Sequence, residues 1–208
     1  MLLAGATGLV GRHVLAQLLA APACGAVVAP TRRALGAVHP KLYNRLVDFD
    51  RLPAQARWWR ADAAICALGT TMRQAGSREA FRRVDHAYPL AIARLARQHG
   101  ATAFALTSAM GADPHARLFY NRVKDELERD LQALGYPALA LIRPGLIGGE
   151  PAQPRAAERA AAVLGVLGPR LPRRYRISPA TCIAAALVAH AVHPRAGVQV
   201  VDAAQLAQ

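Results

Sequence analysis

In Gly5-Ala6-Thr7-Gly8-Leu9-Val10-Gly11, three glycines recur at every third position. The apolar residues 2–4 before them predict the end of a short buried strand, and residues 12–19 after them predict a helix with one apolar side. Glycines spaced in this way suit a nucleotide pyrophosphate, because they permit a tight turn, close approach of the phosphates and close packing of the helix on the strand. The helix N-terminus adds free N–H groups and the positive end of its dipole. The stretch therefore predicts the first strand–turn–helix unit of a nucleotide-binding fold.

The same opening segment also has some features of a secretory signal, since residues 1–23 are largely apolar and end in Ala21-Pro22-Ala23. A signal needs positive charge before an uninterrupted apolar core, however, and here Arg12 and three glycines fall inside that core. We therefore expect a cytoplasmic protein that is not exported. Almost nothing precedes the first strand, which leaves open whether the native chain starts upstream of Met1.

The composition is that of one globular domain. The chain has 208 residues, 53% of them hydrophobic, which is enough for a substantial core. Its longest apolar run, 182–189, is too short to span a bilayer, so no membrane span is expected. The three cysteines, Cys24, Cys66 and Cys182, are far apart, which indicates a reducing compartment and neither a disulfide framework nor a metal site.

The net charge of +13 has two interpretations. A basic chain suggests nucleic-acid binding, but 24 of the 26 basic residues are arginines scattered along the chain, without a helix-turn-helix, zinc-finger or RNP-type motif. Such a distribution is typical of a coding bias toward arginine. We therefore expect no specific nucleic-acid binding, and an anionic small ligand accounts for part of the charge equally well.

Strands alternate with helices along the whole chain. Strands are expected at 2–4, 26–29, 45–49, 63–68, 103–106, 138–142 and 198–201, and helices at 12–19, 77–99, 119–134, 155–167 and 179–192. Pro89 should kink or split the second of these helices. Continuous apolar strands alternating with helices predict an α/β fold with a doubly wound parallel sheet. We expect a single Rossmann domain over 1–208, with 145–195 contributing a small cap on the substrate side.

Thr31-Arg32-Arg33 follows the second expected strand, about twenty residues past the glycine turn. A carboxylate in this region would bind the ribose 2′-hydroxyl of NAD, whereas an arginine accommodates the 2′-phosphate of NADP. Because two arginines and no acid stand here, the sequence favours NADP(H) over NAD(H).

Ser108, Tyr120 and Lys124 form a second pattern. The chain has only three serines, five tyrosines and two lysines, yet one of each falls at this spacing after the fifth expected strand. Tyr120 and Lys124 are four residues apart and share a helix face. In a chain that uses arginine almost everywhere else, Lys124 indicates a need for the compact ammonium group of lysine.

The glycine turn, Ser108 and Tyr120-x-x-x-Lys124 together resemble the short-chain dehydrogenase/reductase (SDR) superfamily, in particular its extended and atypical members. More narrowly, the chain is similar to the Tat-interactive-protein-type branch of atypical SDRs over residues 3 to about 149. The motifs that carry this likeness are Leu68-Gly69-Thr70-Thr71, Ala75-Gly76, Val84-Asp85, Thr107-Ser108-Ala109-Met110-Gly111-Ala112-Asp113 and Arg143-Pro144-Gly145.

The resemblance implies a role for each residue. Tyr120 would donate a proton to a substrate carbonyl oxygen, Ser108 would hydrogen-bond the same oxygen, and Lys124 would lower the tyrosine pKa and hold the nicotinamide ribose. The implied cofactor-binding residues, besides Tyr120 and Lys124, are Gly5, Thr7, Gly8, Leu9, Val10, Gly11, Arg32, Arg33, Asp48, Phe49, Leu68, Gly69, Thr70, Pro144, Gly145 and Ile147.

Two functional hypotheses follow from the resemblance. The first is an NADPH-dependent oxidoreductase that reduces a small carbonyl substrate of unidentified structure, working as a monomer or homodimer. The second is a non-catalytic NADPH-binding sensor that acts on a protein partner. The asparagine that completes a proton relay in many SDRs is not identifiable, and Val84-Asp85-His86 stands in that region.

Overall fold

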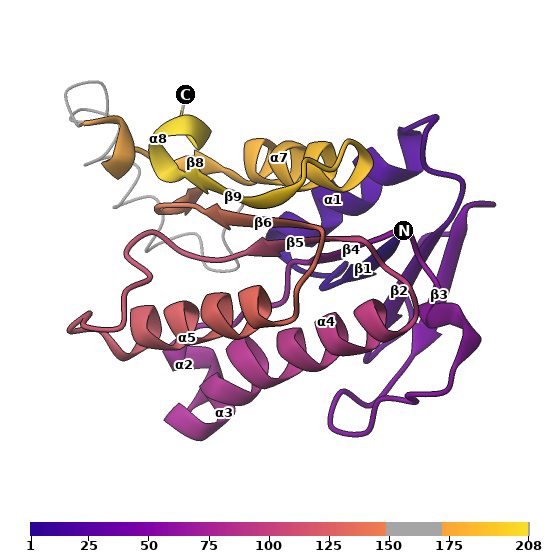
Figure 1. Ribbon diagram of the computed structural model, residues 1–208, viewed down its shortest axis with the longest axis horizontal. Helices are drawn as coiled ribbons and strands as arrows, with labels where there is room; N and C mark the ends of the chain where they lie inside the picture. The colour runs from indigo at the N-terminus through magenta and orange to yellow at the C-terminus, as the bar shows by residue number, and fades with distance from the viewer. Residues whose placement is uncertain (149–171, 208) are drawn as a thin grey trace.

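The computed structural model describes residues 1–148 and 172–207, and within them seven parallel strands form one sheet in the order β3-β2-β1-β4-β5-β6-β9 (Figure 1). The strands are β1 (Leu2–Ala4), β2 (Val27–Thr31), β3 (Leu42–Leu46), β4 (Ala63–Cys66), β5 (Ala103–Thr107), β6 (Ala138–Arg143) and β9 (Gly197–Asp202). The predicted doubly wound, Rossmann-like α/β fold is confirmed.

Burial explains why the positions of the central strands could be predicted from the sequence. Every residue of β1, β4 and β5 is buried, so these strands are continuously apolar or small. The edge strands differ, because Tyr43 and Leu46 on β3 and Val198 and Val200 on β9 are exposed.

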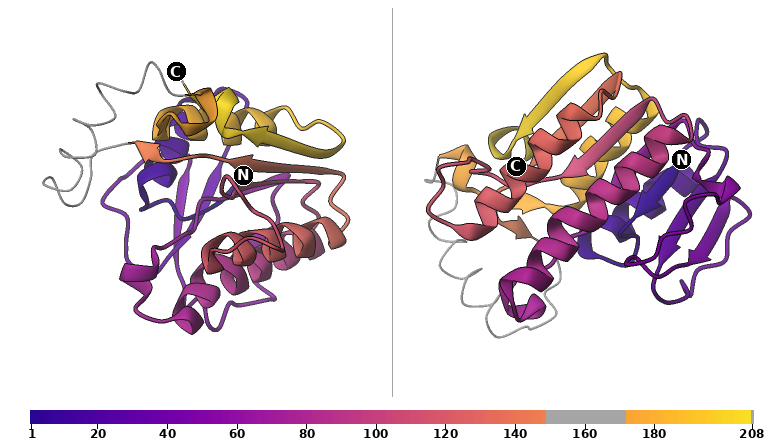
Figure 2. Two further views of the ribbon diagram at one scale, coloured as in Figure 1. Left: turned by 90° about the vertical axis from the view of Figure 1, so that its left-hand side faces the viewer. Right: turned by 60° about the horizontal axis from the view of Figure 1, so that its bottom comes forward.

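Two helices cover each face of the sheet: α1 (Leu9–Ala20) and α7 (Ala180–Val192) on one side, and α4 (Tyr88–Gln98) and α5 (Phe119–Ala133) on the other (Figures 1 and 2). Each pair presents an apolar stripe to the strands. Leu18 of α1 and Leu187 of α7 lie in one core cluster, and Leu127 of α5 lies in the other. None of the helices in the described ranges is long and apolar enough to cross a membrane.

The sheet changes direction at its centre. Leu2 of β1 is in register with Val28 of β2 on one side and with Ala64 of β4 on the other. The chain therefore moves outward from β1 first in one direction and then in the other. In such sheets the ligand site lies at the carboxyl ends of the strands, where the order reverses.

Several element boundaries differ from the prediction. The third strand was expected at 45–49 but lies at Leu42–Leu46, so the expectation was wrong by three residues. The helix expected at 155–167 lies outside the described residues. The remaining short elements are α2 (Met72–Ala75), α3 (Arg78–Arg82), α8 (Ala203–Leu206), two 3-10 turns at Arg57–Trp59 and Arg173–Tyr175, and the paired strands β7 (Ile147–Gly148) and β8 (Ser178–Pro179).

The helical stretch expected at 77–99 is three helical segments in series. Ser77 caps α3, since its side chain accepts a hydrogen bond from the Ala80 N–H at 3.1 Å. A π-helical turn at Arg83–Ala87, here called η2, then leads into α4. Pro89 lies in the first turn of α4, and it has no N–H for the α-helical hydrogen-bond pattern. The irregularity expected near Pro89 is therefore present as the wider π-helical turn immediately before it.

The predicted cap at 145–195 includes a helix that belongs to the sheet layers. Helix α7 packs beside α1 over the sheet, and it leads into β9, which pairs with β6. Residues 149–171 lie outside the described part of the chain, so a cap formed by the rest of this range stays a prediction.

The packing of α1 on β1 gives a test of the glycine turn. A Cβ on Gly11 would lie 1.9 Å from the Gly5 carbonyl oxygen, whereas a Cβ on Gly25 would meet nothing within 4 Å. We expect Gly11→Ala to lower the free energy of unfolding by about 1–3 kcal/mol, the usual cost of overpacking, and Gly25→Ala to change it by less than about 0.5 kcal/mol. Urea denaturation measures both, and equal stability of the two variants would contradict the packing.

Candidate functional site

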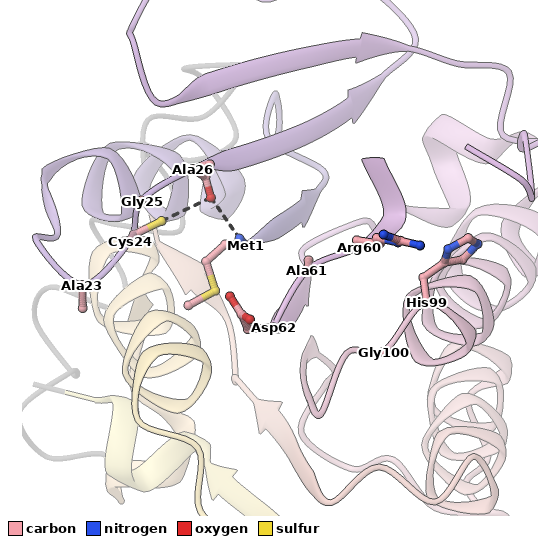
Figure 3. A pocket seen from close by; sticks show the side chains of 10 residues that line it. All are labelled: Met1, Ala23, Cys24, Gly25, Ala26, Arg60, Ala61, Asp62, His99 and Gly100. Atoms are coloured by element: carbon pink, nitrogen blue, oxygen red, sulfur yellow. Dashed lines mark hydrogen bonds between the residues drawn. The ribbon is translucent and has the colours of Figure 1, made fainter. Parts of the chain in front are cut away.

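The predicted site residues gather at the carboxyl edge of the sheet, because each follows a parallel strand or begins the helix after it. A separate hollow of about 490 Å³ lies at the opposite, amino edge, between Met1, Asp62, Arg60 and His99 (Figure 3). None of the predicted site residues lines it. Ligands of doubly wound sheets bind at the carboxyl edge, and we therefore take that edge as the candidate site.

The glycine turn joins β1 to α1 with little free space. Gly5 has φ +89°, a conformation that favours glycine, and a Cβ on it would lie 2.6 Å from the Ala67 backbone. The Gly8 N–H donates to the Gly5 carbonyl at 2.9 Å and closes the turn. Gly5 and Gly11 are therefore required by the contacts of the fold itself.

Gly8 is different, because packing does not require a glycine there. A Cβ on Gly8 would meet only the Gly5 and Ala67 carbonyl oxygens, at 3.4 and 3.9 Å. Gly8 is the N-cap of α1, which has no side-chain cap and no acidic residue in its first turn. The bare backbone at this helix N-terminus fits a pyrophosphate, which would approach the N–H groups of Leu9, Val10 and Gly11.

Arg32 and Arg33 lie just past β2, next to the glycine turn in the sheet, and both are exposed. The loop that carries them is fixed by Asn44. The side-chain amide of Asn44 donates to the Thr31 hydroxyl at 2.7 Å, and that hydroxyl donates to the Arg33 carbonyl at 2.7 Å. Two guanidinium groups on an ordered loop suit a phosphate monoester.

Asp48 and Phe49, expected to flank an adenine, are placed differently from each other. Asp48 is exposed, and its carboxylate accepts the Asp50 N–H at 2.9 Å. The Phe49 side chain is buried in the core on the α4 side, with its ring 5.5 Å from that of Tyr88. The structure thus places Phe49 mainly as a packing residue.

Tyr120 and Lys124 lie one turn apart on α5 and face each other. The Lys124 ammonium is 5.8 Å from the centre of the Tyr120 ring, and the centre of the Phe81 ring is 5.6 Å from it. Burial raises the pKa of Tyr120 above its usual range; Lys124 opposes this rise and Asp85 adds to it. The phenol is therefore neutral at physiological pH, the form that can donate a proton.

Lys124 is itself buried and paired. Its ammonium lies 2.7 Å from a carboxylate oxygen of Asp85, and the two side chains are only 3% and 1% exposed. Burial alone would lower the lysine pKa, but Asp85, together with Tyr120 and Cys66, outweighs this effect and raises the pKa of Lys124. The other Asp85 oxygen accepts the Thr70 N–H at 2.8 Å, which ties the predicted Leu68–Thr70 segment to the pair.

Ser108 is buried at the end of β5, and its hydroxyl donates to Glu128 of α5. Glu128 is 1% exposed and also accepts the Arg143 Nε–H at 3.0 Å. In this arrangement the Ser108 hydrogen is directed to a carboxylate within the protein. Its role as a ligand of a substrate carbonyl stays a prediction.

The residues after β6 form a turn at the same edge. The Pro144 carbonyl accepts the Met110 N–H at 2.8 Å, and the Gly145 N–H donates to the Ser178 hydroxyl at 3.2 Å. Ile147 is exposed on β7. The structure thus brings this turn beside the segment that follows Ser108, while its contacts with a nicotinamide stay a prediction.

Sequence reasoning missed three residues of this site: Asp85, Glu128 and Arg143. All three carry charges that the fold buries or partly buries, at 1%, 2% and 29% side-chain exposure. The available signals were slight. Glu128 follows Lys124 by one helical turn, and Asp85 stands in the region where many SDRs have a relay asparagine.

Together these features define a class by fold: a Rossmann-like α/β protein with a doubly wound parallel sheet. No family model matches the chain. Among solved structures it is similar to MoeE5 in complex with UDP-glucuronic acid and NAD (TM-score 0.74, 17% identity, 96% of this chain and 74% of that chain). It is also similar to the UDP-glucuronic acid 4-epimerase of Bacillus cereus in complex with NAD (TM-score 0.72, 11% identity, 97% and 76%). At these identities the likeness concerns the fold alone.

The particular family follows from sequence relatives. The chain is 35% identical over 176 residues to "Protein fmp52, mitochondrial" of Aspergillus fumigatus, covering 80% of this chain and 74% of the relative. It is 34% identical, with 80% and 75% coverage, to the protein of the same name from Emericella nidulans. The chain belongs to the Fmp52 family. These relatives do not confirm the predicted likeness to the Tat-interactive-protein-type branch.

The relatives also correct one expectation. A cytoplasmic location was predicted from the absence of a recognisable export signal, but the Fmp52 relatives are named mitochondrial proteins. The prediction was wrong because it tested only for a secretory signal at Met1–Ala23, which says nothing about delivery to a mitochondrion.

The buried charges of α5 give a second test. Glu128→Gln removes the charge that receives Ser108 and Arg143, so we expect the free energy of unfolding to fall by about 2–4 kcal/mol. Glu126→Gln, on the same helix, breaks the exposed pair with Arg82, at 35% and 45% side-chain exposure; it should cost about 0–1 kcal/mol. Urea denaturation measures both variants, and a larger loss of unfolding free energy in Glu126→Gln than in Glu128→Gln would disprove the ranking.

Proposed function

We propose that the chain is an NADP(H)-dependent oxidoreductase that reduces a small carbonyl compound, with Tyr120 as the proton donor. The observation that carries the proposal is the position of Tyr120 and Lys124, one turn apart on α5 at the same sheet edge as the Gly5–Gly11 turn. A dinucleotide cradle and a partly buried phenol at one edge are what hydride transfer to a carbonyl needs from a protein.

The cofactor assignment rests on two local features. The bare N-terminus of α1 beside Gly8 suits the pyrophosphate, and Arg32 and Arg33 suit a 2′-phosphate. Leu68–Thr70 follow β4, the neighbour of β1, and Pro144–Ile147 follow β6 at the same edge of the sheet; these segments would line the ribose and the nicotinamide. When bound, NADPH supplies the hydride for the carbonyl carbon.

The chain's own residues supply the proton and the orientation. The neutral Tyr120 phenol gives its proton to the carbonyl oxygen, which becomes the hydroxyl of the product alcohol. Ser108 would orient the same oxygen after its hydroxyl turns from Glu128. The phenolate that remains lies beside the Lys124 ammonium, whose effect Asp85 weakens, and it is reprotonated from water.

The second candidate is a non-catalytic NADPH-binding sensor acting on a protein partner. One observation favours it: Ser108 and Lys124, the two helpers of Tyr120, are both held by buried carboxylates, Glu128 and Asp85. A site whose polar groups are satisfied internally can bind a cofactor without turning over a substrate. The two candidates share the cradle and differ in whether Tyr120 is needed as an acid.

Cofactor preference tests the first half of the proposal. The unmodified protein should bind NADPH more tightly than NADH, and Arg32→Ala/Arg33→Ala should weaken NADPH binding by about 1–3 kcal/mol while leaving NADH binding nearly unchanged. Arg195→Ala removes an exposed arginine from the loop before β9 at the opposite edge and is the control for general charge. Isothermal titration calorimetry gives all the affinities, and equal binding of NADPH and NADH to the unmodified protein would refute the assignment.

Turnover tests the second half. Aldehydes, ketones and quinones are screened for NADPH oxidation, and Tyr120→Phe should then lower kcat on any hit by about 10²–10⁴-fold with little change in NADPH affinity. Tyr43→Phe removes an exposed hydroxyl on β3 and should leave kcat unchanged. A Tyr120→Phe variant as active as the parent would rule out Tyr120 as the proton donor. Tight NADPH binding with no carbonyl reduced would favour the sensor.

A further inference from the structure

We propose that Asp85 is a positioning residue that neutralises Lys124 and so keeps Tyr120 in its protonated form, the form in which it can donate a proton. The inference rests on the proposed role of Tyr120 as the acid. It assigns a function to a buried carboxylate in the region where SDR-type sequences were expected to carry a relay asparagine.

The first step is the contact itself. Asp85 Oδ1 lies 2.7 Å from the Lys124 ammonium, and both side chains are almost completely buried. Two opposite buried charges at this distance largely cancel each other's electric field at nearby groups. The positive charge that would otherwise act on Tyr120 is therefore accompanied by a negative one.

The second step is the position of the carboxylate, which is fixed from two sides. Its other oxygen accepts the Thr70 N–H at 2.8 Å, in the loop after β4. The π-helical turn η2 presents Asp85 to Lys124, while the next residue, His86, reaches Asp130 of the same helix α5 at 2.8 Å. Asp85 thus joins three elements at the candidate site.

The third step concerns the other groups that face the phenol. Phe81 of α3 contributes an apolar ring. Cys66 of β4 lies within electrostatic range of the pair, but burial raises the pKa of its thiol to about 12, so it is neutral. In the parts of the chain that the structure describes, Lys124 and Asp85 are the charged groups that act on the Tyr120 phenol.

The consequence follows from the signs. An unpaired ammonium beside a phenol favours the phenolate, whereas an ammonium paired with a carboxylate does so only weakly. Burial, which favours the neutral phenol, then dominates and raises the pKa of Tyr120. A neutral phenol can give a proton to a carbonyl oxygen, whereas taking one from an alcohol requires the phenolate, so this pair holds Tyr120 in the protonation state from which carbonyl reduction starts.

The experiment is a titration of Tyr120 that needs neither cofactor nor substrate. The protein, labelled with tyrosine carrying ¹³C at Cζ, has five tyrosine resonances to follow by NMR, and Tyr120→Phe assigns the one of interest. The readout is the ionised fraction of Tyr120 at the highest pH at which circular dichroism shows every variant to be native. Relative to the parent, Asp85→Asn should increase this fraction and Lys124→Met should decrease it.

The double variant Asp85→Asn/Lys124→Met removes both charges and should return the ionised fraction toward that of the parent. If Asp85→Asn alone does not fold, the comparison of the double variant with Lys124→Met still isolates the carboxylate, and the double variant must then be the more ionised. The matched control is Asp130→Asn, which removes a carboxylate from α5 that pairs with His86; it should leave Tyr120 unchanged.

A merely structural role for Asp85 would not move Tyr120 in opposite directions in the two single variants. An unchanged or decreased ionised fraction in Asp85→Asn, or an unchanged or increased one in Lys124→Met, overturns the proposal. Failure of the reductase assays would not affect this titration, so the two proposals fail separately.

Discussion

The carbonyl oxygen of Gly5 and the Cα of Gly11 meet so closely that no side chain fits between them, and the candidate site depends on this contact. It draws the N-terminus of α1 onto the carboxyl end of β1, where a helix dipole and unpaired N–H groups face outward. β1 is also the strand from which the sheet extends in both directions, to β2 and to β4. The glycine contact therefore places an anion-binding helix end at the centre of the edge on which all the other candidate residues lie.

How much of the fold the sequence could predict depended on burial. β1, β4 and β5 have neighbours on both sides and helices on both faces, so their residues are apolar and their positions were clear. β3 is an edge strand with exposed residues such as Leu46, and no apolar run marks it. The predicted strand extended to Phe49 because of its large apolar side chain, but Phe49 lies after the end of β3 and packs in the core.

The candidate site was predictable only where rare residues mark it. Tyr120 and Lys124 stand out because the chain has so few tyrosines and lysines, and the structure places them together. Asp85, Glu128 and Arg143 do not stand out, because charged residues are usually solvated and nothing in a single sequence says which will be buried. Asp85 lies buried in the π-helical turn just before α4; Pro89 predicted a kink in this region, but not a π-helical turn or which residue that turn would bury.

The two buried carboxylates divide the site into two units that share one helix. Glu128 holds Ser108 and Arg143, and Asp85 holds Lys124, with α5 contributing Glu128 to one unit and Lys124 to the other. Buried ion pairs often add little net stability, because desolvating the charges costs about as much as their attraction returns. Their value here is positional, since each carboxylate fixes a polar group that would otherwise have several orientations. Tyr120 is the one residue of the predicted triad without such a carboxylate partner among the described residues, so its hydroxyl is the one that no carboxylate of the protein already holds.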